Sequence, residues 1–375
     1  MLIPITVTPT VSSMKNDHKK NILVCPLNWG KGHLTRVQVI AYELKKSGHK
    51  VYFAAPAKLH SSIDKSVYDK LLHIWSPGIF YSGVLPLSID ILIQLPVLLF
   101  AFLADRLTIP RLVRAYDIDI VISDNRFGAR SGKKYSVYIT HQLRIALPRA
   151  IRFMEPLVSQ LHRLVAGRYD EFWIPDYPGK NNLSGSLSHN CKHPPNTHYI
   201  GPLTRLSSDP PLKGVRGMSF FTLALLSGPE PQRSKFERII ISRRHIFPGK
   251  LIIVAGKPGD SVKTDKDIQR YSWLDGPELK SLLESAGLVI CRSGYSTIMD
   301  INLLGCPVLM VPTPGQPEQE YLASHMAGMY GINIIEQKEL ARLSELPAIK
   351  KDIEWPGMID RPLDKVLDEL IKRSP

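Results

Sequence analysis

The sequence alternates short apolar runs with amphipathic helical segments. Asn21–Cys25 (NILVC) is an apolar run typical of a buried strand. From Leu34 to Leu44 apolar residues recur at three- and four-residue spacing, and Gly48 stands where a helix would end, which predicts a helix after that strand. Val51–Ala55 supplies the next strand. This order opens a doubly wound α/β domain, in which ligands bind at the carboxyl ends of the strands.

The alternation continues and then restarts. Further strands are predicted at Ile118–Ser123, Ser136–Thr140 and Glu171–Pro175, with a helix over Leu147–Val165. After the segment Tyr199–Leu203 and a stretch rich in Pro and Ser, strands are predicted at Phe220–Leu226, Lys250–Ala255, Leu288–Cys291, Pro307–Val311 and Gly331–Ile335, with helices at Pro277–Ser285, Ser296–Leu304 and Glu318–Ala327. The expected fold class is α/β, with two Rossmann-like, doubly wound domains facing each other across a cleft.

Length agrees with this organisation, because 375 residues at about 150 residues per domain suggest two domains. We expect a disordered N-terminal extension over residues 1–20, a first domain over 21–201 and a second domain over 202–355. Residues 356–375 should form a C-terminal helix that packs back on the first domain. Hydrophobic residues make up 44% and charged residues 22% of the chain, which excludes a disordered or coiled-coil protein.

Basic charge is concentrated in the first half of the chain. The formal net charge is +14, and residues 1–200 hold 25 basic and 13 acidic side chains. Such an excess fits an anionic membrane surface, a nucleic acid or a phosphorylated substrate, and it also fits a solvated basic surface. The sequence has no RRM, KH, zinc-finger or helix–turn–helix pattern, so we expect no nucleic-acid partner.

One apolar run interrupts the alternation. Val84–Leu103 is nearly long enough to cross a bilayer, but Asp90 and Gln94 would be costly there, and the prolines at 86 and 96 are expected to break a helix. Three arginines follow at once: Arg106, Arg111 and Arg114. We expect contact with the membrane interface, with a core helix or a true span as the alternatives. With four cysteines and no CxxC pair, the predicted location is cytoplasmic and peripheral at the inner face of the membrane.

A glycine-bearing loop follows the first predicted strand. It covers Asn28–His33 (NWGKGH), where glycines let a ligand approach the backbone and the next helix offers N–H groups to an anion. The loop is not a Walker A sequence, and the dinucleotide fingerprint is incomplete because residue 35 is Thr, which disfavours a dehydrogenase. His33 is a candidate general base near neutral pH, or else a structural histidine at a helix start.

A second site is predicted where Cys291–Thr297 (CRSGYST) leaves a strand and opens a helix. One turn into that helix, the Asp300 carboxylate can accept hydrogen bonds from both hydroxyls of a ribose, or can simply be solvated. After the next strand, Pro312–Glu320 (PTPGQPEQE) places amides and carboxylates at another helix start. Such groups suit the hydroxyls of a sugar.

These motifs carry a resemblance to a known family. Residues 291–340, from CRSGYST to EQKEL, resemble the C-terminal donor-binding domain of family 28 glycosyltransferases. The loop Asn28–His33 resembles that family's first glycine-rich loop, and Ser227–Ser234 (SGPEPQRS) stands where the first glycine loop of the second domain is expected. The resemblance implies the GT-B fold, with the acceptor bound by the first domain and the nucleotide sugar by the second.

The resemblance also implies residue roles. His33 would be the catalytic base, Asp300 would bind the ribose hydroxyls, and Gln319 and Glu320 would bind the donor sugar. The pyrophosphate would lie near Ser227, Gly228, Arg292, Ser293 and Gly294. The other implied donor-binding residues are Arg233, Ser296, Thr297 and Gln316. On the acceptor side the implied residues are Asn28, Gly30, Gly32, His141 and Gln142.

The resemblance leaves the donor sugar and the acceptor open. Glu320 stands where the peptidoglycan-type members have glutamine, and their first loop is richer in glycine than NWGKGH.

The expected reaction is an inverting transfer of a hexose or N-acetylhexosamine from a nucleotide sugar, UDP-linked, to a hydroxyl of a lipid-linked or cell-envelope glycan. We expect no cofactor and no metal, because no DxD-like carboxylate pair stands out and helix N-termini with Arg292 or Arg233 could stabilise the leaving diphosphate. Two alternatives stay open. One is a sugar-nucleotide 2-epimerase or hydrolase of the same fold, and the other is a non-catalytic nucleotide-sugar-binding subunit.

Overall fold

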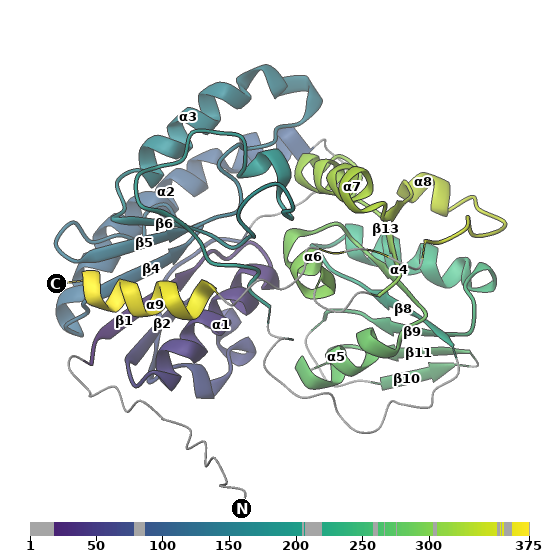
Figure 1. The fold of residues 1–375 in the computed structure, drawn as a ribbon, viewed down its shortest axis with the longest axis horizontal. Helices are drawn as coiled ribbons and strands as arrows, with labels where there is room; N and C mark the ends of the chain where they lie inside the picture. Colours follow the sequence, from purple (N-terminus) through teal and green to yellow (C-terminus); the bar gives the residue numbers. More distant parts are fainter. Residues whose placement is uncertain are drawn as a thin grey trace, which may run out of the picture.

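The computed structural model describes residues 19–78, 87–204, 206, 220–257, 262–265, 267–274, 276–302, 306–350, 353, 355 and 362–374. Two α/β domains lie side by side, and each is built on a seven-stranded sheet (Figure 1). The expected fold class is confirmed. The expected N-terminal extension and most of the segment after Leu203 lie outside the described residues.

The first domain contains a parallel sheet in the order β3-β2-β1-β4-β5-β6-β7. Its strands are β1 Asn21–Pro26, β2 Lys50–Ala55, β3 Lys70–His73, β4 Ile120–Asp124, β5 Tyr135–Ile139, β6 Glu171–Ile174 and β7 Thr197–Tyr199. Helices cover both faces, so the central strands are buried and mostly apolar, and all five residues of β4 are buried, including Ser123 and Asp124 at its carboxyl end.

The second domain repeats this plan with the order β10-β11-β9-β8-β12-β13-β14, in which only β10 runs antiparallel to its neighbour. Its strands are β8 Phe221–Leu225, β9 Lys250–Val254, β10 Val262–Asp265, β11 Ile268–Tyr271, β12 Leu288–Cys291, β13 Val308–Met310 and β14 Asn333–Ile334. The predicted strand at 288–291 coincides with β12, because a run buried on both faces leaves an unambiguous apolar pattern.

Helices connect the strands. The first domain holds α1 Lys31–Lys46, α2 Leu87–Ala115 and α3 Glu155–Ala166, with short 3₁₀ turns η1 Ala57–Ser62, η2 Lys65–Val67, η3 Arg149–Met154 and η4 Gly185–Leu187. The second holds α4 Gln232–Ser242, η5 Arg244–Ile246, α5 Gly276–Ser285, α6 Tyr295–Asn302, α7 Pro317–Tyr330 and α8 Gln337–Leu340. The last helix, α9 Pro362–Arg373, packs on the first domain, where Arg373 Nε lies 3.0 Å from Glu171 Oε1 (Figure 1).

Three sequence expectations about elements differ from the structure. The strands β3, β7, β10 and β11 were not predicted, because each has at most one buried residue, and all four residues of β10 are exposed. The helix expected over 147–165 begins as the 3₁₀ turn η3 before α3. The expected break at Pro96 is wrong, since α2 continues through both Pro96 and Pro110. Proline removes one helical hydrogen bond and crowds the preceding turn. The flanking side chains of Leu95 and Val97 are exposed, so this part of α2 can adjust its turn without disturbing the packing of these two residues.

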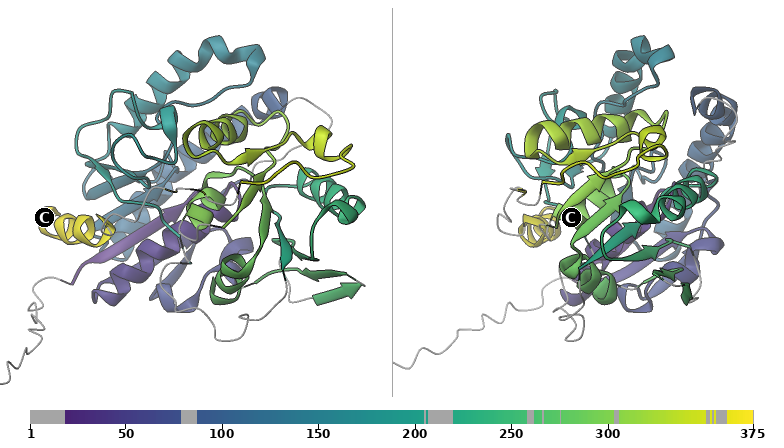
Figure 2. Two further views of the ribbon diagram at one scale, coloured as in Figure 1. Left: turned by 45° about the vertical axis from the view of Figure 1, so that its right-hand side comes forward. Right: turned by 90° about the vertical axis from the view of Figure 1, so that its right-hand side faces the viewer.

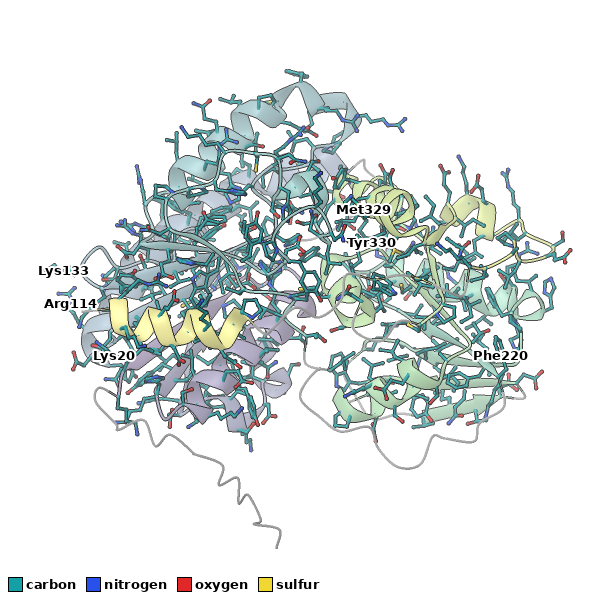
Figure 3. The ribbon with its side chains drawn as sticks, viewed as in Figure 1. Lys20, Arg114, Lys133, Phe220, Met329 and Tyr330 are labelled. Atoms are coloured by element: carbon teal, nitrogen blue, oxygen red, sulfur yellow. The ribbon has the colours of Figure 1, made fainter. Side chains whose placement is uncertain are left out.

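The two domains share one hydrophobic core. A single cluster of buried apolar side chains includes members from both sheets and from α6, α7 and α9. Across the boundary, the Tyr295 hydroxyl donates to the carbonyl of Pro175 at 2.8 Å, and the Tyr330 hydroxyl donates to the carbonyl of Asn182 at 3.0 Å. Figure 3 shows Tyr330 at the end of α7 that lies toward the first domain. These contacts hold the carboxyl ends of the two sheets near each other.

Candidate functional site

His33 and Asp124 meet at the carboxyl edge of the first sheet. Asp124 ends β4, which pairs with β1, and the loop after β1 leads into α1, whose first turn carries His33. Gly30 has φ +100°, a conformation that favours glycine and that turns the chain sharply into α1. The result is a distance of 3.0 Å from His33 Nδ1 to Asp124 Oδ2. The carboxylate is fully buried, and the imidazole is partly exposed.

Arg36 completes this cluster from the next turn of α1. Its Nε donates to Asp124 Oδ2 at 2.9 Å, its second amino group bonds Oδ1, and that group also lies 2.9 Å from His33 Nδ1. Burial by itself would raise the pKa of Asp124, but the charges of Arg36 and His33 outweigh it and hold the pKa below its usual value. In the tautomer with the proton on Nδ1, His33 donates to Asp124 and Nε2 keeps its lone pair as a base, whereas in the other tautomer Nδ1 accepts from the Arg36 amino group.

His141 joins this cluster to the second domain. It follows β5, its Nδ1 lies 3.3 Å from an Arg36 amino group, and its Nε2 lies 2.8 Å from Oε1 of Glu318 on α7. The imidazole also stacks on the Tyr295 ring, with centroids 4.0 Å apart and planes 4° from parallel. Burial lowers the pKa of His141, although Glu318 opposes that shift. A neutral ring fits both contacts, because Nδ1 then accepts from Arg36 and Nε2–H donates to Glu318.

The starts of α1 and α6 lie against each other. A Cβ on Gly32 would come within 2.4 Å of Ser296 Oγ, so this contact tolerates no side chain at residue 32. The first turn of α6 also carries Gly294 and the buried Thr297. A helix N-terminus offers unpaired N–H groups and a positive dipole end, both suited to an anion.

The candidate residues on α6 and α7 are tied into one framework. Gln319 Oε1 accepts from the Thr313 amide at 2.9 Å, and the Ser293 hydroxyl donates to the Gln319 carbonyl at 2.7 Å. Glu320 Oε1 accepts from the Gly315 amide at 2.9 Å. Gln316 precedes the first residue of α7 as its N-cap. The amide and carboxylate groups expected to meet a sugar are therefore held by the loop that precedes α7.

Asp300 lies on the same helix as Ser296, one turn further along. Its Oδ1 accepts from the Thr204 hydroxyl at 2.6 Å, and its side chain is partly exposed. Thr204 belongs to the segment that joins the two domains, so the expected ribose ligand stands beside the domain connection.

Two expected cations have other contacts. The Arg292 guanidinium is buried, donates to the carbonyls of Val311 and Pro312, and lies 4.0 Å from the centre of the Phe236 ring. Burial lowers its pKa to about 10. This side chain braces the interior of the second domain, which does not fit the expected role at a leaving diphosphate. The sequence could not show that Arg292 is buried, because the same residue pattern after a strand occurs whether the side chain points into the site or into the core.

Arg233 is paired near the expected diphosphate loop. Its Nε lies 3.2 Å from Glu230 Oε1, and its first amino group donates to the Gly256 carbonyl at 3.0 Å. Burial raises the pKa of Glu230, but hydrogen bonds from Arg233 and Ser234 lower it to a net value of about 2. Ser227 and Gly228 lie between β8 and this pair.

On the acceptor side, the remaining candidates line the ends of β1 and β5. Asn28 is buried and its Nδ2 donates to the Ser76 carbonyl at 2.9 Å. The Gln142 amide donates to Thr140 Oγ1 at 3.0 Å, and the Gln142 side chain, through its hydrogen bond to Glu318, helps to lower the pKa of Glu318 against the effect of burial. Gln142 therefore belongs to the same contact between the domains as His141.

Sequence reasoning missed four members of the site, which are Arg36, Asp124, Tyr295 and Glu318. Asp124 directly follows the predicted strand Ile118–Ser123, and the carboxyl end of a central strand is where ligands bind. Arg36 lies three residues after His33, on the same helix face. Both signals were present in the sequence. Among the described residues, no group of three His, Cys, Asp or Glu side chains is arranged to hold a metal ion.

Comparison with known proteins finds a family model that matches part of the second domain. Residues 249–351 match the model of the glycosyltransferase family 28 C-terminal domain. An uncharacterized glycosyltransferase of Methanosarcina acetivorans is 25% identical over 312 residues, which cover 78% of this chain and 79% of that protein. A UDP-N-acetylglucosamine–N-acetylmuramyl-(pentapeptide) pyrophosphoryl-undecaprenol N-acetylglucosamine transferase of Glaesserella parasuis is 36% identical over 74 residues, about a fifth of each chain (20% and 21%).

Solved structures show the same fold over nearly the whole chain. The kitacinnamycin glycotransferase superimposes with a TM-score of 0.58 at 17% identity and covers 95% of both chains. A calicheamicin glycosyltransferase superimposes with a TM-score of 0.59 at 14% identity, over 96% of this chain and 91% of that one. The predicted GT-B fold is confirmed, as is the resemblance to family 28.

Proposed function

We propose that this chain, a glycosyltransferase of the GT-B fold with a family 28 C-terminal domain, transfers a hexose or N-acetylhexosamine from a UDP-sugar to a hydroxyl group of a lipid-linked or cell-envelope glycan. The observation that carries the proposal is the His33–Asp124 pair, placed at the edge of the first sheet directly opposite the start of α6. A base on one domain thus faces an anion-binding helix end on the other.

The reaction uses His33 as the general base. As the acceptor oxygen attacks the anomeric carbon, its proton passes to His33 Nε2, and the bond from that carbon to the diphosphate breaks, with the electron pair leaving on the diphosphate. Asp124 holds the imidazole by Nδ1 and stabilises the imidazolium that forms. One direct displacement inverts the configuration at the anomeric carbon.

The second domain binds the donor. The N-terminus of α6, with Ser293, Gly294 and Thr297, stabilises the negative charge that develops on the diphosphate. Asp300 binds the ribose hydroxyls, and Gln319 and Glu320 bind the sugar. Arg233, at the start of α4 after the loop that holds Ser227 and Gly228, is the charged candidate for the diphosphate, since Arg292 is buried in the core. Charge stabilisation by a helix end and by fixed dipoles makes a bound metal unnecessary in this scheme.

Donor specificity is tested first by calorimetric titration with UDP, GDP and dTDP. We expect uridine-selective binding that Asp300→Ala weakens by at least about tenfold, since the variant removes a charge-assisted hydrogen-bond acceptor. Asp364→Ala, which removes an exposed carboxylate on α9, is the matched control and should bind like the wild type. Binding of no nucleotide would contradict the proposal.

Transfer is then measured with UDP-sugars as donors and detergent-solubilised polyprenyl-diphosphate glycans as acceptors. Mass spectrometry gives the mass of the product and NMR gives its anomeric configuration. Each reaction is run with and without EDTA. A β-linked product from an α-linked donor, formed equally with EDTA, supports the inverting, metal-independent scheme. Conversion or hydrolysis of the UDP-sugar with no acceptor present would instead favour an epimerase or hydrolase. Nucleotide binding with no turnover on any acceptor would favour a non-catalytic subunit.

A further inference from the structure

Helix α3 turns its apolar face away from the protein. Leu157, Leu161 and Leu164 are spaced along one face of the helix and are 54%, 54% and 61% exposed, whereas the polar residues Ser159 and His162 are buried. A surface helix of a soluble domain ordinarily has the opposite arrangement. This inverted face needs an apolar partner.

Specific contacts fix α3 in that orientation. The Ser159 hydroxyl accepts from the Ile145 amide at 3.0 Å. On the same buried side of the helix, His162 Nε2 lies 3.2 Å from the Tyr138 hydroxyl. Burial lowers the pKa of His162 to about 4, so this ring is neutral and stays inside. The leucines are therefore held outward by the packing of the opposite face.

The turn before α3 adds a bulky apolar residue and two cations. In η3, Phe153 is 81% exposed, and Arg149 and Arg152 are exposed beside it. Glu155 lies 3.9 Å from Arg152, a loose exposed pair that leaves the segment cationic overall. An exposed aromatic residue between two arginines, next to an apolar helix face, is suited to the interface of an anionic bilayer.

Helix α2 supplies a second apolar surface. Its exposed apolar residues are Ile89, Ile93, Leu95, Val97, Leu99, Phe100, Leu103 and Leu107. The second half of the helix is anchored, because Arg126 Nε donates to Asp105 Oδ2 at 2.8 Å and Ile109 and Val113 are buried in the core of the first domain. The first half extends beyond that anchor with apolar side chains exposed.

By length and composition, Ile93–Ala115 is the one described helix that could cross a membrane. A span over that segment would have to pull Asp105, Ile109 and Val113 out of the first domain, which would break a buried ion pair and open its core. The structure therefore favours a helix that lies in the interface over one that spans.

The loop after β4 connects both helices to the His33–Asp124 pair. Gly128 lies against α2, where a Cβ would come within 2.6 Å of the Phe102 carbonyl, and the Phe127 ring packs edge-on against His162 of α3 at 5.1 Å. The same loop begins right after Asp124. Figures 1 and 2 show α3 and the beginning of α2 in the upper part of the first domain, whereas the end of α2 lies lower, at its outer edge. The two apolar helices therefore flank the loop that leaves the candidate catalytic site.

We infer that the exposed faces of α2 and η3–α3 form one docking surface that inserts shallowly into an anionic lipid bilayer. The cations of this surface are those of η3. Figure 3 places Arg114 at the outer edge of the first domain with Lys20 and Lys133, away from the second domain. Arg114, one of the three arginines expected to flank the apolar run, therefore lies at the other end of α2. The delivery of a lipid-linked acceptor to His33 by this docking rests on the proposed function. The binding of lipid by the surface does not.

The test is flotation of the full chain with vesicles of phosphatidylcholine alone or with phosphatidylglycerol, at low and high salt. The docking variants are Leu157→Gln/Leu161→Gln/Leu164→Gln on α3 and Leu99→Gln/Phe100→Gln/Leu103→Gln on α2. The control is Ile241→Gln/Ile334→Gln, which removes two exposed apolar side chains of the second domain. All these residues are exposed, so the variants should fold, and UDP titration of each one checks this independently.

We expect the wild type to bind phosphatidylglycerol vesicles and to be released by salt. Each docking variant should lower the partition coefficient by about tenfold or more, since each loses three apolar side chains from the bilayer contact, while the control floats like the wild type. Equal flotation of the α3 variant, or no flotation of the wild type, would overturn the inference. Resistance of the bound protein to alkaline carbonate extraction would also overturn the inference, because it indicates a membrane span. A dimer in sedimentation that the docking variants convert to a monomer would overturn it as well, because the apolar surface would then be a contact between two copies. If UDP binding fails but flotation holds, only the proposed function fails.

Discussion

The imidazole Nδ1 of His33 lies 3.0 Å from Oδ2 of Asp124, a carboxylate that is fully buried at the end of β4. When His33 donates its Nδ1 proton to Asp124, the second nitrogen of His33 is the proton acceptor. The pairing also brings the last residue of a central strand into the candidate catalytic site, together with Arg36.

Replacement of His33 by alanine should lower kcat by about 100- to 10,000-fold, because a general base contributes about that much. UDP affinity should stay within about twofold, since the base belongs to the first domain and the nucleotide site to the second. Steady-state kinetics and calorimetry of the same preparation check both parts. His245→Ala, at an exposed histidine of the second domain, is the control, and a His33→Ala turnover within a few fold of wild type would refute the assignment.

Asp124→Asn should destabilise the protein at pH 7 by about 3–5 kcal/mol, because it leaves Arg36 buried without its counter-ion. The folded pKa of Asp124 is lowered, with burial opposed by Arg36 and His33. Its contribution is therefore fully present above the unfolded value of about 3.9 and is lost as the pH falls from there through the lower folded pKa. Urea unfolding from pH 7 to pH 3 should show the gap between the two proteins closing below about pH 4. A gap that does not vary with pH would argue against a charged Asp124.

Glu318→Ala should weaken the contact between the domains by about 1–3 kcal/mol, because it leaves the buried Nε2–H of His141 without an acceptor. Glu318→Gln keeps an oxygen that can accept this hydrogen bond and should cost less than about 1 kcal/mol. Thermal unfolding of both variants measures the difference. Glu345→Ala, at an exposed glutamate after α8, serves as a surface control. Equal losses for Ala and Gln would mean that charge, not the hydrogen bond, holds His141.

Gly32→Ala should lower kcat/KM by about tenfold or more, because the new Cβ would meet Ser296 Oγ at 2.4 Å and force α1 away from α6; a small misplacement of reacting groups carries a cost of this order. Gly132→Ala adds the same methyl group in open space and should have no effect. The pair Gly32→Ala/Ser296→Gly removes the obstructing side chain and should recover most of the loss. Failure of this rescue would show that the loss arises elsewhere than in the helix contact.

The sequence predicted the two α/β domains because strands buried on both faces are continuous apolar runs, and their order with helices leaves few topologies. It also indicated His33, Asp300 and Gln319, since glycine-bearing loops and polar residues after predicted strands mark the carboxyl edge of a parallel sheet. Edge strands such as β10 were missed because exposed residues carry no apolar period. The same reasoning that found His33 could have found Asp124, which follows a predicted strand.

The sequence pattern could not predict the direction in which a side chain points or the residues it contacts. Arg292 and Arg233 occupy similar places in sequence, after a strand and at a helix start, yet the first is buried against Phe236 and the second lies beside Glu230 near the diphosphate loop. The apolar run at 84–103 predicted contact with a membrane interface. It did not predict that α3, some 50 residues away in sequence, would present a second apolar face at the same end of the domain.

The sequence by itself therefore determined the fold class, the order of most elements and the loops that carry the candidate site, because local periodicity and turn residues encode these. Only the tertiary structure decided that His33 pairs with Asp124, that His141 reaches Glu318 across the domain boundary and that the leucines of α3 point outward. Each of these depends on contacts between residues far apart in the chain, whose distances are set by how whole sheets and domains pack and not by spacing along the sequence.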